Sequence, residues 1–178
     1  MVMKKKIKRY VLTGGPSCGK STSIENFRNR GFSVLEEVAR GMIEKRGSFP
    51  TEKKEIKKFQ NEMFYEQLRK EDKLNGEMVF LDRGVGDYHA YSEHLIGYVP
   101  ENTNIDFGNR YSKIFVLDRL PFIDDGLRIE SGDEEAEILH NRIIQSYASA
   151  GYELVFVPVM PIEERSEFIL DYINKNGN

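Results

Sequence analysis

Residues 14–22 read GGPSCGKST, and 14–21 match the pattern G-x-x-x-x-G-K-[ST], which is typical of loops that bind the phosphates of a nucleotide. Glycine at both ends of the pattern permits backbone angles at which consecutive N–H groups point at one phosphate. The lysine neutralises the β- and γ-phosphates, and the serine hydroxyl after it is a ligand for Mg²⁺. The stretch predicts ATP and Mg²⁺ binding, with Lys20 also catalytic and Ser21 on the metal. The expected nucleotide ligands are Gly14, Gly15, Pro16, Ser17, Cys18, Gly19, Lys20, Ser21 and Thr22.

The flanks of this stretch supply the context that the pattern requires. An apolar segment at 7–13 predicts a strand directly before it, and 23–30 predicts a helix directly after it. A chance match in an ordinary loop would lack this arrangement. The N-terminus of the helix adds a partial positive charge that favours a bound phosphate.

Strands and helices alternate along the rest of the chain, and the strands are continuous apolar runs. This combination predicts a parallel sheet that is covered by helices on both faces. We therefore expect an α/β protein: a three-layer sandwich of the P-loop type, whose five parallel strands lie in the order 2-3-1-4-5. The expected strands cover 7–13, 32–35, 78–81, 114–117 and 154–157, and the expected helices cover 23–30, 37–46, 51–74, 88–96, 134–150 and 162–174.

The composition is that of an ordinary globular protein. The 178 residues are 39% hydrophobic and 31% charged, which predicts a single domain over 1–178. A net charge of −3 gives no basic surface for nucleic acid, and no apolar run approaches the roughly 20 residues that span a bilayer. Cys18 is the only cysteine, which indicates a reducing compartment. We expect a cytoplasmic protein without nucleic-acid or membrane partners.

Asp82 and Arg83 follow the third expected strand, in the stretch FLDRG. Ligands of such sheets gather at the carboxyl ends of the strands, and the third strand is expected beside the first. Asp82 is therefore expected to hold Mg²⁺ or to accept a substrate proton, and Arg83 to bind substrate. The alternative is an ordinary salt bridge between the two at the surface.

Glu36 and Glu37 follow the second expected strand, where a phosphate acceptor would lie. One of them is a candidate general base for the hydroxyl of the acceptor, and Arg40 can hold it or bind substrate. The alternative is a solvated helix start, where acidic residues are favoured.

The segment 119–133 contains Pro121, Gly126, Gly132 and many charges, which predicts a loop that closes over the phosphates. Arg119 and Arg128 are its only arginines. Either can instead pair with Asp124, Asp125 or Glu130. The three histidines have no metal-ligand spacing and are interpreted as structural.

Five blocks, YVLTGGPSCGKST, VLEEVAR, VFLDRG, LPFIDDGLR and GYELVFVPVMPIEERSEFIL, together resemble a family of small bacterial AAA-type predicted ATPases or kinases. That family is related to the ribosylnicotinamide kinase domain of the bacterial NAD regulator, and the Asp-Arg pair also resembles deoxynucleoside and thymidylate kinases. The resemblance implies that Glu37 is the base, that Arg128 rather than Arg119 is the catalytic arginine, and that Val159, Met160 and Pro161 line the adenine site.

These observations favour a phosphotransferase that moves the γ-phosphate of ATP to a small hydroxyl acceptor, such as a nucleoside-like molecule. The alternative is a nucleotide-hydrolysing or regulatory protein without an acceptor. A guanine-reading Asn-Lys-x-Asp motif is absent from the sequence. The acceptor and the oligomeric state stay open, with a homodimer as one option.

Overall fold

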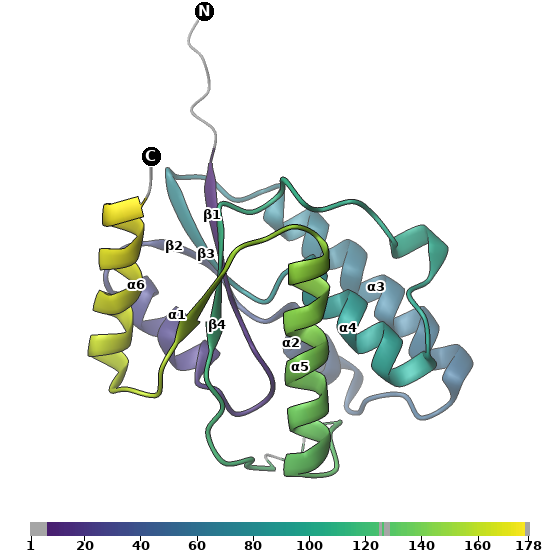
Figure 1. Ribbon diagram of the computed structural model, residues 1–178. Coiled ribbons are helices and arrows are strands. Elements are labelled where there is room, and N and C mark those ends of the chain that lie inside the picture. The colour runs from purple at the N-terminus through teal and green to yellow at the C-terminus, as the bar shows by residue number, and fades with distance from the viewer. Residues whose placement is uncertain (1–6, 125, 127–128, 177–178) are drawn as a thin grey trace, which may run out of the picture.

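The computed structural model describes residues 7–124, 126 and 129–176, and its centre is a five-stranded sheet in which every neighbouring pair is parallel (Figure 1). The strand order β2-β3-β1-β4-β5 is the predicted one. Because β1 is central, the loop that follows it emerges between the ends of β3 and β4. The strands are Lys8–Thr13 (β1), Ser33–Leu35 (β2), Met78–Asp82 (β3), Lys113–Leu117 (β4) and Leu154–Val157 (β5).

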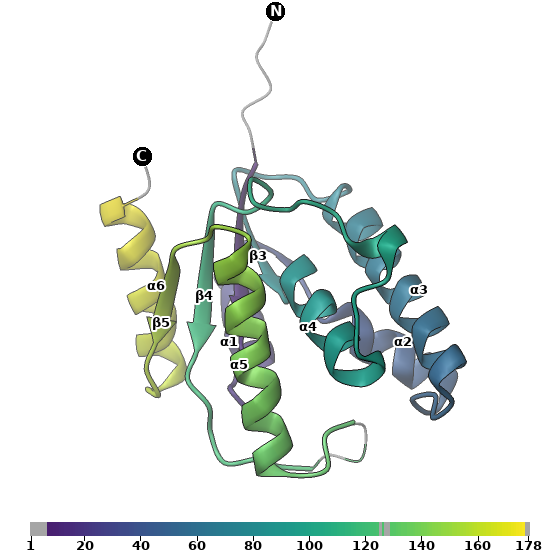
Figure 2. The same ribbon diagram turned by 45° about the vertical axis from the view of Figure 1, so that its right-hand side comes forward.

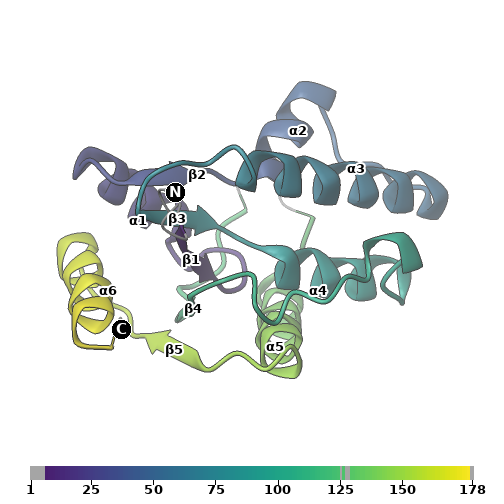
Figure 3. The same ribbon diagram turned by 90° about the horizontal axis from the view of Figure 1, so that it is seen from above.

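Helices cover both faces of the sheet, as the continuous apolar strands predicted. Seen from above in Figure 3, α1 and α6 lie on one side, and α2, α3, α4 and α5 lie on the other. The helices are Lys20–Asn29 (α1), Val38–Arg46 (α2), Lys53–Glu71 (α3), Val85–Ile96 (α4), Asp133–Ser149 (α5) and Ile162–Asn176 (α6), with a short 3₁₀ helix at Glu101–Thr103.

The core is divided by the sheet into two apolar clusters. On the α1 and α6 side, the rings of Phe27 and Phe80 stack with centroids 3.8 Å apart. On the other side, Val11 and Leu81 pack beneath α3, α4 and α5. Burying a side chain of this size stabilises the fold by about 1.5–3 kcal/mol. Burial on both faces explains why the strands read as continuous apolar runs.

The expected helix at 88–96 begins earlier in the structure, at Val85. The N–H group of Gly84 donates to Oδ2 of Asp87 at 3.0 Å, so an acidic side chain in the first turn bonds the backbone at the helix start. The sequence prediction missed this turn because Gly84 and Gly86 disfavour a helix on propensity alone.

The segment between β4 and α5 contains no helix or strand in its described residues and lies at the end of the sheet toward which β4 points (Figure 2). The absence of helix and strand in these described residues is consistent with the loop predicted at 119–133. Among the residues that the structure describes, no helix combines the length and the hydrophobicity that a bilayer crossing needs.

Candidate functional site

The loop after β1 makes turns that require glycine at two positions. Gly14 has φ 130° and Gly19 has φ 79°, a range that other residues rarely adopt. A Cβ atom on Gly14 would lie 2.8 Å from the carbonyl oxygen of Leu117, and one on Gly19 would collide with the guanidinium of Arg165. Ser17 also has a positive φ, 58°. These outliers cluster where α1 begins, so the loop holds its shape before any ligand arrives.

The ammonium group of Lys20 is folded back onto this loop. Nζ donates to the carbonyl oxygens of Gly15 at 2.8 Å and Gly14 at 3.0 Å, and it lies 3.3 Å from Sγ of Cys18. A phosphate would offer Lys20 a charged acceptor, which makes a stronger hydrogen bond than a neutral carbonyl. The cysteine is buried, so its thiol belongs to the packing of the loop.

Ser21 and Asp82 meet at the start of α1 and the end of β3. The serine hydroxyl donates to Oδ2 of Asp82 at 3.0 Å, so the two residues that were expected to hold Mg²⁺ are in contact. The other carboxylate oxygen, Oδ1, is buried and has no hydrogen-bond partner. A buried, unpaired carboxylate oxygen beside a hydroxyl fits the oxygen ligands that Mg²⁺ prefers. The described residues contain no cluster of three or more histidine, cysteine or acidic side chains that could hold a metal ion.

Glu37 and Arg83 form a partly buried ion pair across the ends of β2 and β3. Nε of Arg83 donates to Oε1 of Glu37 at 2.9 Å, and its NH1 donates to Oδ1 of Asp87 at 3.2 Å. The guanidinium also lies over the ring of Tyr91, 5.0 Å from the centroid. Arg83 has φ 74°, an unusual backbone for a residue other than glycine. The alternative of a surface salt bridge between Asp82 and Arg83 is therefore wrong.

The pKa values of the two candidate bases, Asp82 and Glu37, are shifted in opposite directions. Burial, followed by the negative charge of Glu37, raises the pKa of Asp82 to about 6. Burial also pushes the pKa of Glu37 upward, but the charges of Arg83 and Lys20 outweigh it, so the pKa of Glu37 is lowered. Two neighbouring carboxyl groups with opposite pKa shifts are an arrangement found at catalytic sites.

Asp82→Asn is expected to stabilise the nucleotide-free protein at high pH. The pKa of Asp82 in the folded protein, about 6, lies above its ordinary 3.8. Such a group costs stability above its folded pKa and costs none below its ordinary pKa. The variant should therefore have a free energy of unfolding about 1–3 kcal/mol higher than wild type near pH 8, and about equal to it near pH 4. Urea unfolding of both proteins measures this, and a gain that is the same at both pH values contradicts it.

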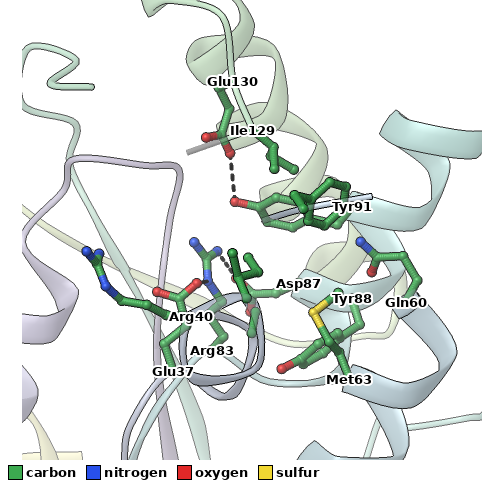
Figure 4. Close-up of a pocket in the computed structure, with 13 residues that line it drawn as sticks. Glu37, Arg40, Gln60, Met63, Arg83, Asp87, Tyr88, Tyr91, Ile129 and Glu130 are labelled. Carbon is green, nitrogen blue, oxygen red and sulfur yellow. Dashed lines mark hydrogen bonds and ion pairs between the residues drawn. The ribbon is translucent and has the colours of Figure 1, made fainter. Parts of the chain in front are cut away.

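A cavity of about 80 Å³ lies next to the Glu37–Arg83 pair, between α2, α3, α4 and the residues before α5 (Figure 4). Its apolar wall includes Met63 and Tyr88, and Gln60 contributes an amide whose Oε1 is buried without a hydrogen-bond partner. A second cavity, of about 290 Å³, is lined by Glu37 together with Ser21 and Asp82. Glu37 is thus the carboxylate that faces both spaces.

Glu36 and Arg40 are exposed, whereas Glu37 is partly buried. Glu36 is exposed and pairs with Arg28 at 2.5 Å. Arg40 bonds Glu44 at 3.3 Å through Nε and acts on Glu37 through its charge, whereas Arg83 makes the ion pair that was expected of Arg40. In Figure 4 the guanidinium of Arg40 extends away from the Tyr91 side of the cavity.

The 119–133 segment is attached to the loop after β1 at two points. The N–H group of Leu120 donates to the carbonyl oxygen of Ser17 at 3.1 Å, and that of Ile123 donates to the Ser17 hydroxyl at 3.1 Å. At its far end, Glu130 accepts a hydrogen bond of 2.9 Å from the Tyr91 hydroxyl. The described residues of this segment therefore contact both the loop after β1 and the cavity beside Glu37.

Of the two arginines in this segment, the structure describes Arg119 but not Arg128. Arg119 pairs with Asp133 at 2.5 Å and so joins the start of the segment to the start of α5. Among the described residues its acidic partners are Asp133 and Glu137 rather than the predicted Asp124 or Glu130, and the third predicted partner, Asp125, lies outside them. Arg128 lies outside the described residues, so its predicted role stays a prediction.

The connection from β5 to α6 is attached to the same loop through Arg165, which the sequence analysis overlooked. NH1 of Arg165 donates to the carbonyl oxygen of Gly19 at 3.0 Å and to the Ser23 hydroxyl at 3.2 Å, while NH2 donates to the carbonyl oxygen of Met160 at 3.1 Å. The side chain is buried. An arginine in the first turn of a helix opposes the helix dipole, and this is the sequence signal that could have revealed it.

Val159 and Pro161, which were expected at the adenine, flank Met160 in this connection and are both exposed. They follow β5 whereas Glu37 follows β2, and these two strands are the opposite edges of the sheet. Their positions separate them from the Glu37 cavity, and their contact with adenine stays a prediction.

His140 and Asp87 are further residues whose partners the sequence did not indicate. Nδ1 of His140 accepts the N–H group of Gly15 at 3.0 Å; burial, then the charges of Arg119 and Lys20, lower the histidine's pKa and favour this neutral, accepting form. Asp87 accepts hydrogen bonds from the hydroxyl groups of Thr13 and Tyr147, both at 2.7 Å. The spacing of four residues between Arg83 and Asp87 was the available signal for their pairing.

The strand order and the loop between β1 and α1 are those of the P-loop kinase fold. A family model described as an AAA domain matches residues 9–165, so the chain belongs to this AAA-domain family. None of the curated proteins matches the chain in sequence.

Three solved structures share the fold. Deoxyadenosine kinase from M. mycoides, with dCMP and dCDP bound, is 19% identical, with a TM-score of 0.60 over 94% of this chain and 99% of that one. Thymidylate kinase from Candida albicans is 16% identical, with a TM-score of 0.59 over 97% of this chain and 93% of that one. The NadR protein in complex with NR is 19% identical, with a TM-score of 0.68 over 95% of this chain and 50% of that one. This chain therefore spans half of NadR, and at these identities the likeness shows the fold alone.

Proposed function

We propose that the protein is an ATP-dependent kinase that transfers the γ-phosphate to a hydroxyl group of a small, nucleoside-like molecule. One observation carries the proposal: a partly buried carboxylate with a lowered pKa, Glu37, lines both the cavity that contains Ser21 and Asp82 and the adjoining cavity between α2, α3 and α4. A base in that position lies between a nucleotide site and an acceptor site, which phosphoryl transfer requires.

On the nucleotide side, the loop 14–19 and the start of α1 would surround the phosphates with N–H groups, and Lys20 would turn from its carbonyl partners to the β- and γ-phosphates. Ser21 and Asp82 would hold Mg²⁺, and Mg²⁺ bound there supplies positive charge to the transferring phosphate. Val159, Met160 and Pro161 would contact the adenine, and Thr22 would complete the nucleotide site.

On the acceptor side, the hydroxyl oxygen of the acceptor attacks the γ-phosphorus while the bond from that phosphorus to the ADP oxygen breaks. The hydroxyl proton passes to the carboxylate of Glu37, which Arg83 holds in place at 2.9 Å. Arg40 would contribute to acceptor binding at the edge of the cavity, and Arg128 would stabilise charge on the transferring group.

The 119–133 segment would open to admit the acceptor. The cavity of about 80 Å³ is smaller than the about 300–1,000 Å³ of typical ligand sites. Ile129 and Glu130 form part of its wall, so an outward movement of these two residues enlarges it. Closure afterwards excludes water from the transfer.

The test is an acceptor screen with the purified protein and Mg-ATP. Nucleosides and vitamin-type alcohols are incubated singly, and phosphorylated product and ADP are measured in parallel. We expect at least one acceptor to yield product in step with ADP. ADP release that no acceptor changes, with no phosphorylated product, would instead favour the ATP-hydrolysing alternative.

Arg165 is expected to support ATP binding by joining the carbonyl oxygens of Gly19 and Met160. Arg165→Met should raise the KM for ATP about 10-fold or more with a smaller change in kcat. The reason is that the guanidinium of Arg165 bonds both Gly19 in the phosphate loop and Met160 in the expected adenine site, and the substitution removes both hydrogen bonds. Loss of a buried donor should also lower the free energy of unfolding by about 1–3 kcal/mol. Arg165→Lys should restore part of the affinity.

Arg30→Met is the matched control, because Arg30 also bridges α1 and α6, through Glu163 and Glu167, but does not touch the loop. Its KM for ATP should equal that of wild type. Similar changes in both variants would mean that Arg165 only supports the packing of the two helices.

A further inference from the structure

The described lining of the cavity beside Glu37 carries more negative than positive charge. Its described lining contains two arginines, Arg40 and Arg83, and three carboxylates, Glu37, Asp87 and Glu130, so its formal net charge is −1. An acceptor that brings its own phosphate would add further negative charge to this space. Like charges brought together at a binding site cost several kcal/mol in general, which is enough to exclude a ligand.

The more deeply placed arginine is already engaged by acidic partners. Arg83 is bonded to Glu37 at 2.9 Å and to Asp87 at 3.2 Å, and its flat face lies over Tyr91. These two bonds use two of the five N–H groups of the guanidinium, and both acceptors are carboxylates that a phosphate binding Arg83 would have to approach. A phosphate that displaced Glu37 would break this partly buried ion pair and leave an uncompensated charge, which is strongly unfavourable.

The other walls around Glu37 are acidic as well. Glu130 is buried, and the Tyr91 hydroxyl holds its carboxylate at 2.9 Å against the cavity (Figure 4). On the opposite side, the cavity that contains Asp82 is lined by Glu25, Glu36 and Glu44, of which the first two pair with Arg28 and the third with Arg40. An acceptor that reaches Glu37 from either side therefore passes carboxylates.

We propose that the acceptor carries no anionic group: the protein phosphorylates an uncharged or cationic hydroxyl compound of the nucleoside class, and not a nucleoside monophosphate or another phosphate ester. The inference rests on the proposed kinase function. It narrows that function, because P-loop kinases of this fold include enzymes for both kinds of acceptor, and the charge around the cavity distinguishes them.

The experiment compares matched pairs, each a nucleoside and its 5′-monophosphate, together with one nucleoside whose base carries a fixed positive charge from N-methylation. Phosphorylated product is measured with Mg-ATP, and binding is measured by calorimetry in the presence of a non-hydrolysable ATP analogue. We expect product or binding with a nucleoside at least about 100-fold in excess of its monophosphate, in kcat/KM or in affinity.

Removing one carboxylate from the cavity tests whether negative charge causes the discrimination against the monophosphate. Glu130→Gln keeps an acceptor for the Tyr91 hydroxyl and should reduce the discrimination against the monophosphate by about 5-fold or more, whereas Glu134→Gln, an equal charge change at an exposed position outside the cavity, should leave it unchanged. Discrimination that is identical in both variants overturns the electrostatic argument.

The outcomes separate the two proposals. Preferential use or binding of a monophosphate overturns this inference and leaves the kinase function intact. Binding of nucleosides without any product supports the inference about the cavity and counts against the kinase function. If no compound of either kind binds, the inference is overturned.

Discussion

Lys20→Ala is expected to reduce ATP-dependent turnover by about 10²–10³-fold or more, with or without an acceptor. The reason is that the ammonium group, which bonds the carbonyl oxygens of Gly14 and Gly15 in the structure, is the cation best placed to reach the β- and γ-phosphates. Removing one preorganised group that stabilises transition-state charge costs this much in other enzymes. ADP release and phosphorylated product are the measurements.

The fold should survive this substitution, because Lys20 bonds only the loop and the sheet does not depend on it. Circular dichroism and urea unfolding should show a native protein. Lys113→Ala is the matched control: Lys113 begins β4, at the opposite end of the sheet, and pairs with Glu153 at 2.7 Å. Its turnover should be that of wild type. Normal turnover in Lys20→Ala would refute the assignment of residues 14–21 to the phosphates.

The fold was predictable because its signals are local in the sequence. The pattern at 14–21 needs only its two flanks, and apolar runs identify strands without reference to distant residues. The predicted strand order is the observed one, β2-β3-β1-β4-β5. The start of α4 was missed because the stabilising contact, from Asp87 to the N–H group of Gly84, overrides the low helix propensity of glycine.

The site was predictable only in part, because its contacts join residues far apart in the chain. Ser21 and Asp82 could be paired, since parallel strands end at the same edge of a sheet. Asp87, however, bonds Thr13 and Tyr147, and Arg165 bonds Gly19; no spacing in the sequence indicates these partners. Polar side chains of this kind are recognised only after burial and hydrogen bonding are known.

Glu36 and Glu37 illustrate the limit most clearly. Both follow β2, and residue type alone left them equivalent. The turn into α2 directs Glu36 to Arg28 at the surface and Glu37 to Arg83 in the interior. The resemblance to known kinases favoured Glu37, and the described geometry gives a physical reason for that preference.

Glu37→Gln is expected to lower transfer to the acceptor by about 10²–10⁴-fold, the usual effect of losing a general base. The amide cannot take the hydroxyl proton, although it can still accept a hydrogen bond from Arg83. ATP binding should persist, because the phosphate loop is untouched. Glu36→Gln is the matched control, since Glu36 is exposed and pairs with Arg28. Its transfer rate should be within about twofold of wild type.

Asp82→Asn should give a different pattern, and the comparison identifies the base. If Asp82 holds Mg²⁺ with Ser21, this variant loses every ATP-dependent activity, including slow hydrolysis by water. Because the pKa of Asp82 is raised to about 6, wild-type activity should also fall as the pH drops through about 6, and added Mg²⁺ should move that fall to lower pH. Parallel measurement of product and ADP distinguishes the variants. Loss of both activities in Glu37→Gln would assign Glu37 to the metal or the fold, and unchanged transfer would leave Asp82 as the base.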